Sequence, residues 1–250
     1  MNLFDLSGKR ALVTGARTGL GQGLALALAG AGADIIALGS RPMPDTRQKV
    51  EALGRRFEEV VYDLADPSGL SAVVEGLTQD GNIDILVNNA GQIRRADFTD
   101  FSEKDWDDIM NINLKSTFML SQAVVRHMRD KGLAGRIVNI ASLLSFQGGI
   151  RVASYTSSKH AVAGLTKLMA NELAPNGITV NAIAPGYMDT DNTEALRNDA
   201  NRSRSIFERI PAGRWGEPSD LDTAVLFFCA PASGYVTGQV LAVDGGWLAR

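Results

Sequence analysis

Three polar residues in the second half of the chain have the types and the spacing to transfer a proton. Tyr155 and Lys159 are four residues apart in a segment with helical periodicity, so their side chains share one helix face. A free tyrosine has a pKa of roughly 10, and a neighbouring ammonium lowers it toward the range of an acid–base catalyst. A substrate oxygen that exchanges a proton with the tyrosine could also accept a hydrogen bond from Ser142. On these residues alone, an exposed Tyr–Lys pair and a helix-capping serine remain an open alternative.

A glycine-rich turn near the N-terminus has the features of a phosphate-binding loop. Residues 14–21 read TGARTGLG and stand between a short apolar run and a helical pattern. Glycine lets the backbone turn tightly and approach a pyrophosphate, whose charge then faces the free amides of the helix N-terminus. The spacing G-x-x-x-G-x-G is weak evidence by itself, and its position after the first apolar run strengthens it.

Polar residues also end the third and fourth apolar runs. Asp63, followed by Leu64, could accept a hydrogen bond from an adenine amino group, although it could equally serve as a helix cap before Asp66 and Pro67. The fourth run ends in NNAG at 88–91. Two adjacent asparagines indicate that side-chain amides hold a loop or a cofactor, because an ordinary turn needs only one.

These residues must be positioned by short apolar runs that alternate with longer amphipathic segments. Near-continuous apolar runs are typical of strands covered on both faces. Their alternation with helices through about seven strands predicts an α/β fold, a doubly wound parallel sheet of the Rossmann type with helices on both faces. No linker divides residues 1–250, so one domain is expected. The predicted strands are 11–15, 33–39, 58–64, 83–91, 135–142, 177–186 and 239–246, and the predicted helices are 21–31, 46–53, 67–79, 104–129, 152–174 and 218–228.

Residues 187–209 form the one long segment without a clear pattern. They are polar and follow directly from the carboxyl end of a predicted strand. A long insertion at this place in a compact domain is usually functional. We therefore expect a lid over the substrate rather than an inert loop.

Charge and composition argue against several classes of protein. A net charge of -3 does not suit a surface for nucleic acid or anionic lipid. The start of the chain does not read as a secretory signal, and no stretch approaches the roughly 20 apolar residues of a membrane span. The one cysteine, Cys229, fits a reduced compartment and a cytoplasmic location. His127 and His160 lack metal-ligand spacing, so no metal site is predicted.

Taken together, the motifs resemble the short-chain dehydrogenase/reductase family over essentially the whole chain. The resemblance implies that Tyr155 is the general acid/base, that Lys159 lowers its pKa and holds the nicotinamide ribose, and that Ser142 orients the carbonyl. It also implies that Asn113 holds a water that relays protons to Lys159, whereas a buried amide bonding locally is the alternative. The matching pieces are TGARTGLG, NNAG, MNINL around Asn113, NIAS ending at Ser142, YTSSK at 155–159, PG at 185–186 and VDGG at 243–246.

The same resemblance places a nicotinamide dinucleotide. It implies that the loop glycines contact the pyrophosphate, that Asn89 lies near the adenine-side ribose, and that Thr190 or a neighbour bonds the carboxamide. The expected cofactor-binding residues are Gly15, Arg17, Thr18, Gly19, Leu20, Gly21, Ser40, Arg41, Asp63, Leu64, Asn89, Ala90, Gly91, Tyr155, Lys159, Pro185, Gly186, Met188 and Thr190.

The choice between NAD and NADP rests on mixed evidence. An NAD enzyme of this fold often ends its second strand with an acidic residue that bonds the adenine ribose, but here the first carboxylate is Asp45. Arg41, assisted by Arg17, could pair with a 2′-phosphate. Against that, NADP-binding members often carry their basic residue where this chain has Thr18, and Pro42 can turn Arg41 toward solvent. The branch described next mostly uses NAD, so we predict NAD, with NADP as the alternative.

Several stretches match one branch of the family, whose members act on keto-sugar acids from uronic-acid polysaccharides. They are LSFQGGIRVASYTSSKHAVAGLTK, GYMDTDNTEALRND, and RIPAGRWGEPSDL through AVDGGWLAR. The implied reaction is hydride transfer between NAD(H) and a keto-sugar acid or its secondary alcohol, such as 2-dehydro-3-deoxy-D-gluconate. An acid substrate needs an arginine and polar groups in its pocket, and Arg95 and Arg151 are candidates. The expected substrate residues are Arg94, Ser142, Gln147 and Tyr155.

Two alternative functions stay open at this point. One is 3-oxoacyl-thioester reduction, or polyol or steroid oxidation, by the same fold. The other is a non-catalytic dinucleotide-binding protein, against which the presence of all three of Ser142, Tyr155 and Lys159 argues. The resemblance also implies a homotetramer of dihedral symmetry, with interfaces on helices 104–129 and 152–174 and on segment 240–250.

Overall fold

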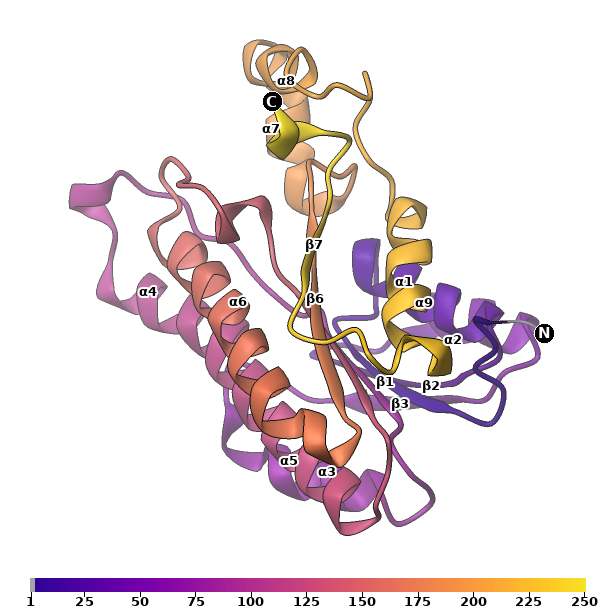
Figure 1. Ribbon diagram of the computed structural model, residues 1–250. Helices are drawn as coiled ribbons and strands as arrows, with labels where there is room; N and C mark the ends of the chain where they lie inside the picture. The colour runs from indigo at the N-terminus through magenta and orange to yellow at the C-terminus, as the bar shows by residue number, and fades with distance from the viewer. Residues whose placement is uncertain (1–2) are drawn as a thin grey trace.

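Seven parallel strands form one sheet in the computed structural model, which describes residues 3–250 except the side chain of Asn192 (Figure 1). The strands are β1 Arg10–Thr14, β2 Asp34–Gly39, β3 Phe57–Val61, β4 Ile85–Asn88, β5 Arg136–Ile140, β6 Thr179–Pro185 and β7 Val240–Val243. Their order is β3-β2-β1-β4-β5-β6-β7, so the order of the sheet reverses between β1 and β4. The doubly wound parallel sheet predicted from the alternating pattern is confirmed.

Helices cover both faces of this sheet. They are α1 Gly19–Gly30, α2 Pro44–Ala52, α3 Leu70–Leu77, α4 Glu103–Met110, α5 Ser116–Asp130, α6 Ala153–Leu173, α7 Glu194–Asn198, α8 Ala200–Phe207 and α9 Asp222–Cys229. α1, α2 and α9 pack on one face, and α3, α5 and α6 on the other (Figure 1). Ala11 and Val13 of β1 join the first core, and Leu12 between them joins the second. A strand covered on both faces must be apolar at every position, which explains the continuous runs. No helix within residues 3–250 is long and apolar enough to cross a membrane.

The helix predicted at 104–129 is interrupted by one π-helical turn, Asn111–Lys115, between α4 and α5. Ser116 Oγ donates to the Ile112 carbonyl at 2.5 Å, and Thr117 Oγ1 donates to the Asn113 carbonyl at 3.1 Å. Hydroxyl groups that bond back four residues occupy main-chain carbonyls and bend a helix. The wide turn brings the Asn113 side chain within 3.2 Å of Ser158 on α6.

The segment between β6 and α9 contains helices that its weak pattern did not predict. After a 3₁₀ turn at Asp191–Thr193 come α7 and α8, which stand above the carboxyl end of β6 and beside the C-terminus (Figure 1). Asp199 caps α8 by accepting from the Asn201 and Arg202 amides. Arg197 ties α7 to the chain after β6 through an ion pair with Asp189 at 2.8 Å.

Candidate active site

A cavity of about 740 Å³ opens at the carboxyl ends of the strands. Its walls come from the segments that follow β1 to β6, together with α6, α8 and the C-terminal turn at Trp247. Such a volume lies in the ordinary range of small-molecule sites. Every residue expected to bind the cofactor lines this cavity, and so do Ser142 and Gln147. Asn113 and Arg94 do not.

The glycine loop between β1 and α1 lets a ligand approach its backbone closely. Gly15 has a φ of 67°, a left-handed conformation that favours glycine. A side chain at Gly21 would overlap the Gly15 carbonyl oxygen and the amide nitrogen of Asn89. Asn89 Nδ2 donates to the Thr14 carbonyl at 2.9 Å, and Thr14 Oγ1 accepts from the amides of Asn89 and Ala90. These bonds join the ends of β1 and β4 into one continuous edge.

The start of α1 suits an anion. The Thr18 side chain makes no capping hydrogen bond, and the first turn of the helix contains no acidic residue. The amides at the helix start therefore remain available, and the helix dipole adds partial positive charge there. A dinucleotide pyrophosphate fits this loop and helix start.

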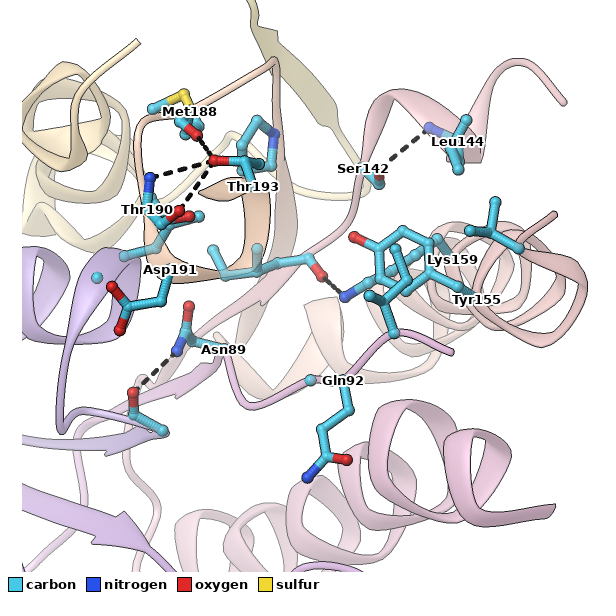
Figure 2. A pocket seen from close by; sticks show the side chains of 18 of the residues that line it. Asn89, Gln92, Ser142, Leu144, Tyr155, Lys159, Met188, Thr190, Asp191 and Thr193 are labelled. Atoms are coloured by element: carbon cyan, nitrogen blue, oxygen red, sulfur yellow. Dashed lines mark hydrogen bonds between the residues drawn. The ribbon is translucent and has the colours of Figure 1, made fainter. Parts of the chain in front are cut away.

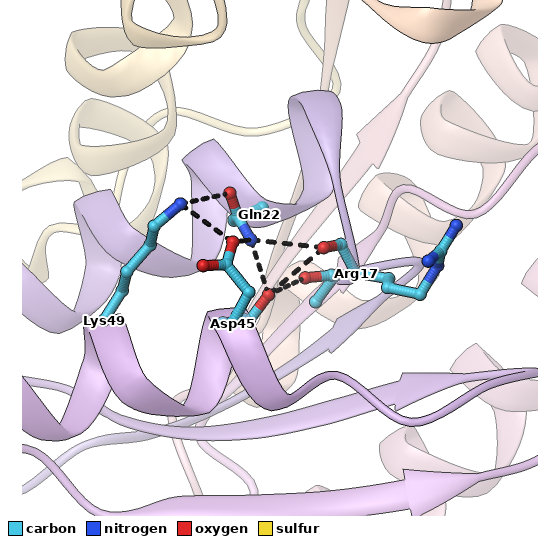
Figure 3. A network of polar contacts seen from close by, with 6 residues as sticks. Arg17, Gln22, Asp45 and Lys49 are labelled. Atoms are coloured by element: carbon cyan, nitrogen blue, oxygen red, sulfur yellow. Dashed lines mark hydrogen bonds and ion pairs between the residues drawn. The ribbon is translucent and has the colours of Figure 1, made fainter.

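A polar network fixes the glycine loop from outside (Figure 3). Gln22 Nε2 donates to the Arg17 carbonyl at 3.2 Å and to Asp45 Oδ2 at 3.0 Å, and Lys49 Nζ donates to the same Asp45 oxygen at 2.9 Å. The bond from Lys49 holds the pKa of the Asp45 carboxyl below its ordinary value. The Arg17 side chain leaves this network, and both Arg17 and Arg41 line the cavity while Asp45 does not. Near the end of β2, the cavity wall therefore contains the guanidinium groups of Arg17 and Arg41 but not the carboxylate of Asp45.

Tyr155, Lys159 and Ser142 meet inside the cavity (Figure 2). The Tyr155 hydroxyl points toward Ser142, and Lys159 Nζ lies 5.6 Å from the centre of the tyrosine ring. Lys159 Nζ donates to the Ile140 carbonyl of β5 at 2.6 Å. Ser145 Oγ donates to the Lys159 carbonyl at 2.6 Å and accepts from the Ser142 amide at 3.3 Å. The turn after β5 therefore sets the position of Ser142 relative to α6.

Burial governs the protonation of the tyrosine and the lysine. It raises the pKa of Tyr155 above the ordinary 10.0, while the hydrogen bond with Ser142 and the charge of Arg95 oppose this rise. It lowers the pKa of Lys159 from 10.5 to about 8. At neutral pH Tyr155 is therefore a phenol and Lys159 an ammonium. The family resemblance implies that Lys159 lowers the pKa of Tyr155, whereas desolvation, which disfavours the phenolate, is the largest influence on this pKa in the structure.

Asn113 lies behind the cavity wall, and its side chain is fully bonded. Oδ1 accepts from the Gln92 amide at 2.8 Å, and Nδ2 donates to the Gln92 carbonyl at 3.0 Å and to Ser158 Oγ at 3.2 Å. Ser158 Oγ in turn donates to the Tyr155 carbonyl at 2.8 Å. The side chain thus joins the chain after β4 to the second turn of α6. Because the side chain is occupied, the water expected at Asn113 would have to bind its main-chain carbonyl oxygen. This oxygen already accepts a hydrogen bond from Thr117 Oγ1.

The turn after β6 supplies another wall of the cavity. Pro185, Gly186, Met188 and Thr190 all line it. Thr193 Oγ1 donates to the Met188 carbonyl at 2.6 Å and to the Thr190 carbonyl at 3.0 Å, as Figure 2 shows. These bonds hold the turn in a fixed shape at the cavity wall.

The structure separates the arginines expected at the substrate. Arg94 Nε pairs with Asp105 at 3.5 Å and does not reach the cavity wall, whereas its neighbour Arg95 does. Arg94, which was predicted as a substrate residue, therefore lies outside the cavity wall and Arg95 lies in it, since neighbouring residues of an extended segment point to opposite sides. Gln147 lines the cavity. Arg151, which has a φ of 64°, pairs with an aspartate at 2.9 Å and does not line it.

Residues near the C-terminus that were not predicted as substrate contacts also line the cavity. Arg202, Ser205 and Arg209 come from α8 and the turn after it, and Trp247 comes from the C-terminal turn. The spacing of three residues would have placed Arg202 and Ser205 on one helix face, had α8 been recognised.

The histidines and the cysteine lie away from the cavity wall. His160 Nδ1 lies 3.1 Å from the Thr156 carbonyl, and burial lowers the pKa of His127 on α5. Burial raises the pKa of Cys229 to about 12, which keeps it a thiol rather than a nucleophilic thiolate. Among the described residues, no three His, Cys, Asp or Glu side chains lie together as a metal site requires.

The fold and the site together define a class of protein. The fold and site combine a doubly wound parallel sheet, a glycine loop that leads into an uncapped helix, and a tyrosine that faces a serine and has a buried lysine beside it. These are the parts of a dinucleotide-dependent oxidoreductase. The family model described as enoyl-(acyl carrier protein) reductase matches residues 15–248. The chain belongs to the short-chain dehydrogenase/reductase family, as its motifs predicted.

Similar proteins span the full length of the chain. A 2-dehydro-3-deoxy-D-gluconate 5-dehydrogenase of Dickeya dadantii is 57% identical over 251 residues, covering 100% of this chain and 99% of the relative. One of Bacillus subtilis is 54% identical, covering 99% and 97%. A crystal structure from Agrobacterium tumefaciens, provisionally described as a 2-deoxy-D-gluconate 3-dehydrogenase with bound NADP, is 55% identical. Its TM-score is 0.95, with 100% of both chains covered.

Proposed function

We propose that this protein is a nicotinamide-dependent oxidoreductase that interconverts a keto-sugar acid and its secondary alcohol in uronate breakdown, with 2-dehydro-3-deoxy-D-gluconate as the model compound. One observation carries the proposal: Ser142 and the Tyr155 hydroxyl face the same region of a cavity whose other wall is the glycine loop. Two full-length relatives with identities above one half are named for this keto-sugar acid, which supports the substrate class.

In the direction of reduction, Tyr155 donates its proton to the carbonyl oxygen, and Ser142 donates a hydrogen bond to the same oxygen. The raised pKa of Tyr155 keeps this proton in place until the substrate oxygen takes it. The Lys159 ammonium, 5.6 Å from the ring centre, stabilises the phenolate that remains. Asn113 positions α6 through Ser158, and its main-chain carbonyl is the site where we place a proton-relaying water.

The cofactor residues fit a dinucleotide in the cavity. The nicotinamide, when bound, supplies or accepts the hydride at the substrate carbon. The loop of Gly15, Gly19 and Gly21 would hold the pyrophosphate, Lys159 would hold the nicotinamide ribose, and the Met188–Thr190 turn would bond the carboxamide. Asp63 and Leu64 would lie at the adenine.

We propose further that the site accepts NADP(H) as well as NAD(H). The preference for NAD predicted from the sequence stays a prediction. Arg17 and Arg41 line the cavity without a side-chain partner among the described residues, and Asp45 is bonded to Lys49 outside it. A guanidinium suits the 2′-phosphate, and a structure 55% identical in sequence carries NADP. The ratio of kcat/KM with NADPH to that with NADH tests this proposal, and a ratio below about one hundredth would contradict it.

At the substrate end, we assign Arg95 and Gln147 to the polar groups nearest the reacting carbonyl. Arg95 lies close enough for its charge to act on the Tyr155 phenol. Segment 187–209 would be the lid of this single domain, because residues from its start at Tyr187 to its end at Arg209 line the cavity. Limited proteolysis with and without cofactor and substrate tests the lid, since closure should slow cleavage within 187–209.

We propose a cytoplasmic homotetramer. Phe118 on α5 and Leu168 on α6 are large apolar side chains with 43% and 51% of their surface exposed, and Leu241 of β7 is 39% exposed. Apolar patches of this kind mark interfaces in soluble proteins. A light-scattering mass of about four times 26.7 kDa is expected, and a monomer mass at micromolar concentration would refute the assembly.

The test of the proposed function is consumption of NADH and NADPH over a panel of keto-sugar acids, with acetoacetyl thioesters and neutral polyols or their ketones as comparison substrates. The second candidate, 3-oxoacyl-thioester reduction, is supported by a relative of lower identity, a 3-oxoacyl-[acyl-carrier-protein] reductase of Vibrio cholerae that is 41% identical over 244 residues. We expect kcat/KM to be higher for a keto-sugar acid, since several arginines line the substrate end of the cavity. Higher turnover of the thioester would reject the proposal.

A further inference from the structure

One face of the α8 region carries two guanidinium groups into the cavity. Arg202 and Ser205 lie on one side of α8 and line the cavity, and Arg209, two residues past the end of the helix, lines it as well. Arg204 is different, because its Nε pairs with Glu208 at 3.1 Å and it does not line the cavity. On α8, Arg202 therefore faces the cavity, whereas Arg204 lies outside it and is paired with the carboxylate of Glu208.

Arg209 is held in place by an aromatic ring. Its guanidinium carbon lies 4.1 Å from the centre of the Trp247 ring. Stacking of this kind uses the flat face of the guanidinium and leaves its in-plane N–H groups free to bind. No carboxylate or carbonyl within the described residues accepts from the Arg209 side chain, and the same is true of Arg202. An oriented guanidinium without an acceptor is prepared for an anionic ligand.

Trp247 is itself fixed and incompletely bonded. It is 4% exposed, and its ring centre lies 4.7 Å from that of Tyr187. The C-terminal turn that carries it is capped by Asp244, which accepts from the Gly246 amide at 2.8 Å and from the Leu248 amide at 2.9 Å. The buried indole Nε1 of Trp247 has no hydrogen-bond partner among the residues that the structure describes. A buried donor without a partner costs about 1–3 kcal/mol, and cavity-lining residues with this property often serve a ligand.

The same aromatic residue connects α8 to the catalytic strand end. Trp247 packs in one apolar cluster with Ile206 of α8, Ile210 and Leu143. Leu143 directly follows Ser142. A group bound by Arg209 is therefore positioned relative to the serine through direct side-chain packing.

We infer that Arg209, assisted by Arg202, binds the carboxylate of the substrate, and that Trp247 orients the Arg209 fork. The inference rests on the proposed function, that is, on a keto-acid substrate. A carboxylate at Arg95 would lie near Tyr155, and its charge would oppose formation of the phenolate when the proton is transferred. The cofactor phosphates have their own positions at the α1 start and at Arg17 and Arg41. The planar fork of Arg209 matches the two oxygens of a carboxylate.

The experiment compares a keto-sugar acid with its neutral primary carboxamide as substrates of the full-length enzyme. In Arg209→Gln, kcat/KM for the acid should fall about 10- to 100-fold, the range for a lost charged hydrogen bond, and that for the carboxamide should change less than about threefold. Arg209→Lys keeps the charge but loses the fork, so it should recover only part of the preference for the acid. Arg204→Gln on the same helix is the matched control and should behave as wild type. The Kd of NADPH, measured by fluorescence, should not change in any of these variants.

The outcomes separate this inference from the proposed function. A wild type that does not prefer the acid over the carboxamide would reject the proposed function and the inference together. A wild type that prefers the acid, with Arg209→Gln retaining that preference, rejects only the role of Arg209. If only Arg95→Gln loses the preference for the acid, the substrate carboxylate binds at Arg95, beside Tyr155. If Arg209→Gln binds NADPH more weakly, Arg209 contacts the cofactor. Each of these last two results overturns the inference.

Discussion

Lys159 should give this enzyme a stability that rises with pH in the alkaline range. Its side chain is 4% exposed, and burial lowers its pKa from 10.5 to about 8. Between these two values the unfolded chain holds a proton that the folded chain has released. The free energy of unfolding therefore increases as the pH rises through this window. Replacement of Lys159 by methionine keeps an unbranched side chain that is one atom shorter and removes the titrating group, so the variant should lose this dependence.

The magnitude follows from the two pKa values. The pKa of Lys159 falls from 10.5 in the unfolded chain to about 8 in the folded one, a difference of about 2.5 pKa units. Burial of the charge therefore lowers the free energy of unfolding of the wild type by about 3 kcal/mol at pH 7. Proton linkage leaves about 2 kcal/mol of this penalty at pH 9 and about 1 kcal/mol at pH 10. Relative to Lys159→Met, the wild type should therefore gain about 1 kcal/mol from pH 7 to 9 and about 2 kcal/mol by pH 10. The bond to the Ile140 carbonyl is lost at every pH and does not change this slope.

Urea unfolding at fixed protein concentration, at pH 7, 8, 9 and 10, measures the effect. Lys167→Met is the matched control, because Lys167 is exposed on the same helix and should run parallel to the wild type. The difference between wild type and Lys159→Met should grow with pH in favour of the wild type. A constant difference across this range would refute the reasoning that Lys159 carries a buried charge at neutral pH.

Three further changes test other parts of the site. Gly21→Ala should weaken NADH binding in a fluorescence titration by more than about tenfold, because a Cβ there overlaps the backbone of the glycine loop. An unchanged Kd would show that the loop does not contact the cofactor. Arg41→Ala should lower kcat/KM with NADPH by about 10- to 100-fold and hardly affect that with NADH. Arg47→Ala is the control, because the Arg47 side chain stacks on a phenylalanine outside the cavity. Equal losses with both cofactors in Arg41→Ala would show that Arg41 does not bind the 2′-phosphate. Ser142→Ala should lower kcat by about 10²- to 10³-fold with little effect on the KM of the cofactor, as expected for a lost donor at the reacting oxygen, and a kcat within about threefold would contradict this role.

The sheet and most helices could be predicted because burial on both faces leaves a pattern that is local in the sequence. The apolar run around Val13 is an example, since each of its side chains enters one of two cores. α7 and α8 could not be predicted in this way. They are five and eight residues long and largely exposed, so their order depends on tertiary contacts such as the pair of Arg197 with Asp189.

That Tyr155, Lys159 and Ser142 lie together in one cavity was predictable from motif and spacing, but the chemical state of the tyrosine and the lysine was not. Tyr155 and Lys159 are four residues apart on one helix, and this spacing fixes a shared face. Their pKa values depend on burial by distant segments, which the sequence does not show. The same limit explains Arg94. Which of two adjacent arginines faces the cavity depends on the path of an irregular segment, and here Asp105 holds Arg94 outside it.

The most direct test of the whole account is the oxidation of NADH and NADPH by purified enzyme with keto-sugar acids, run in parallel for wild type and Tyr155→Phe. The account predicts turnover of at least one keto-sugar acid by the wild type. It also predicts a loss of at least about 10² in kcat for Tyr155→Phe with cofactor binding retained, because only the proton donor is removed. No cofactor oxidation with any keto-sugar acid, or Tyr155→Phe activity within a few-fold of wild type, would contradict it.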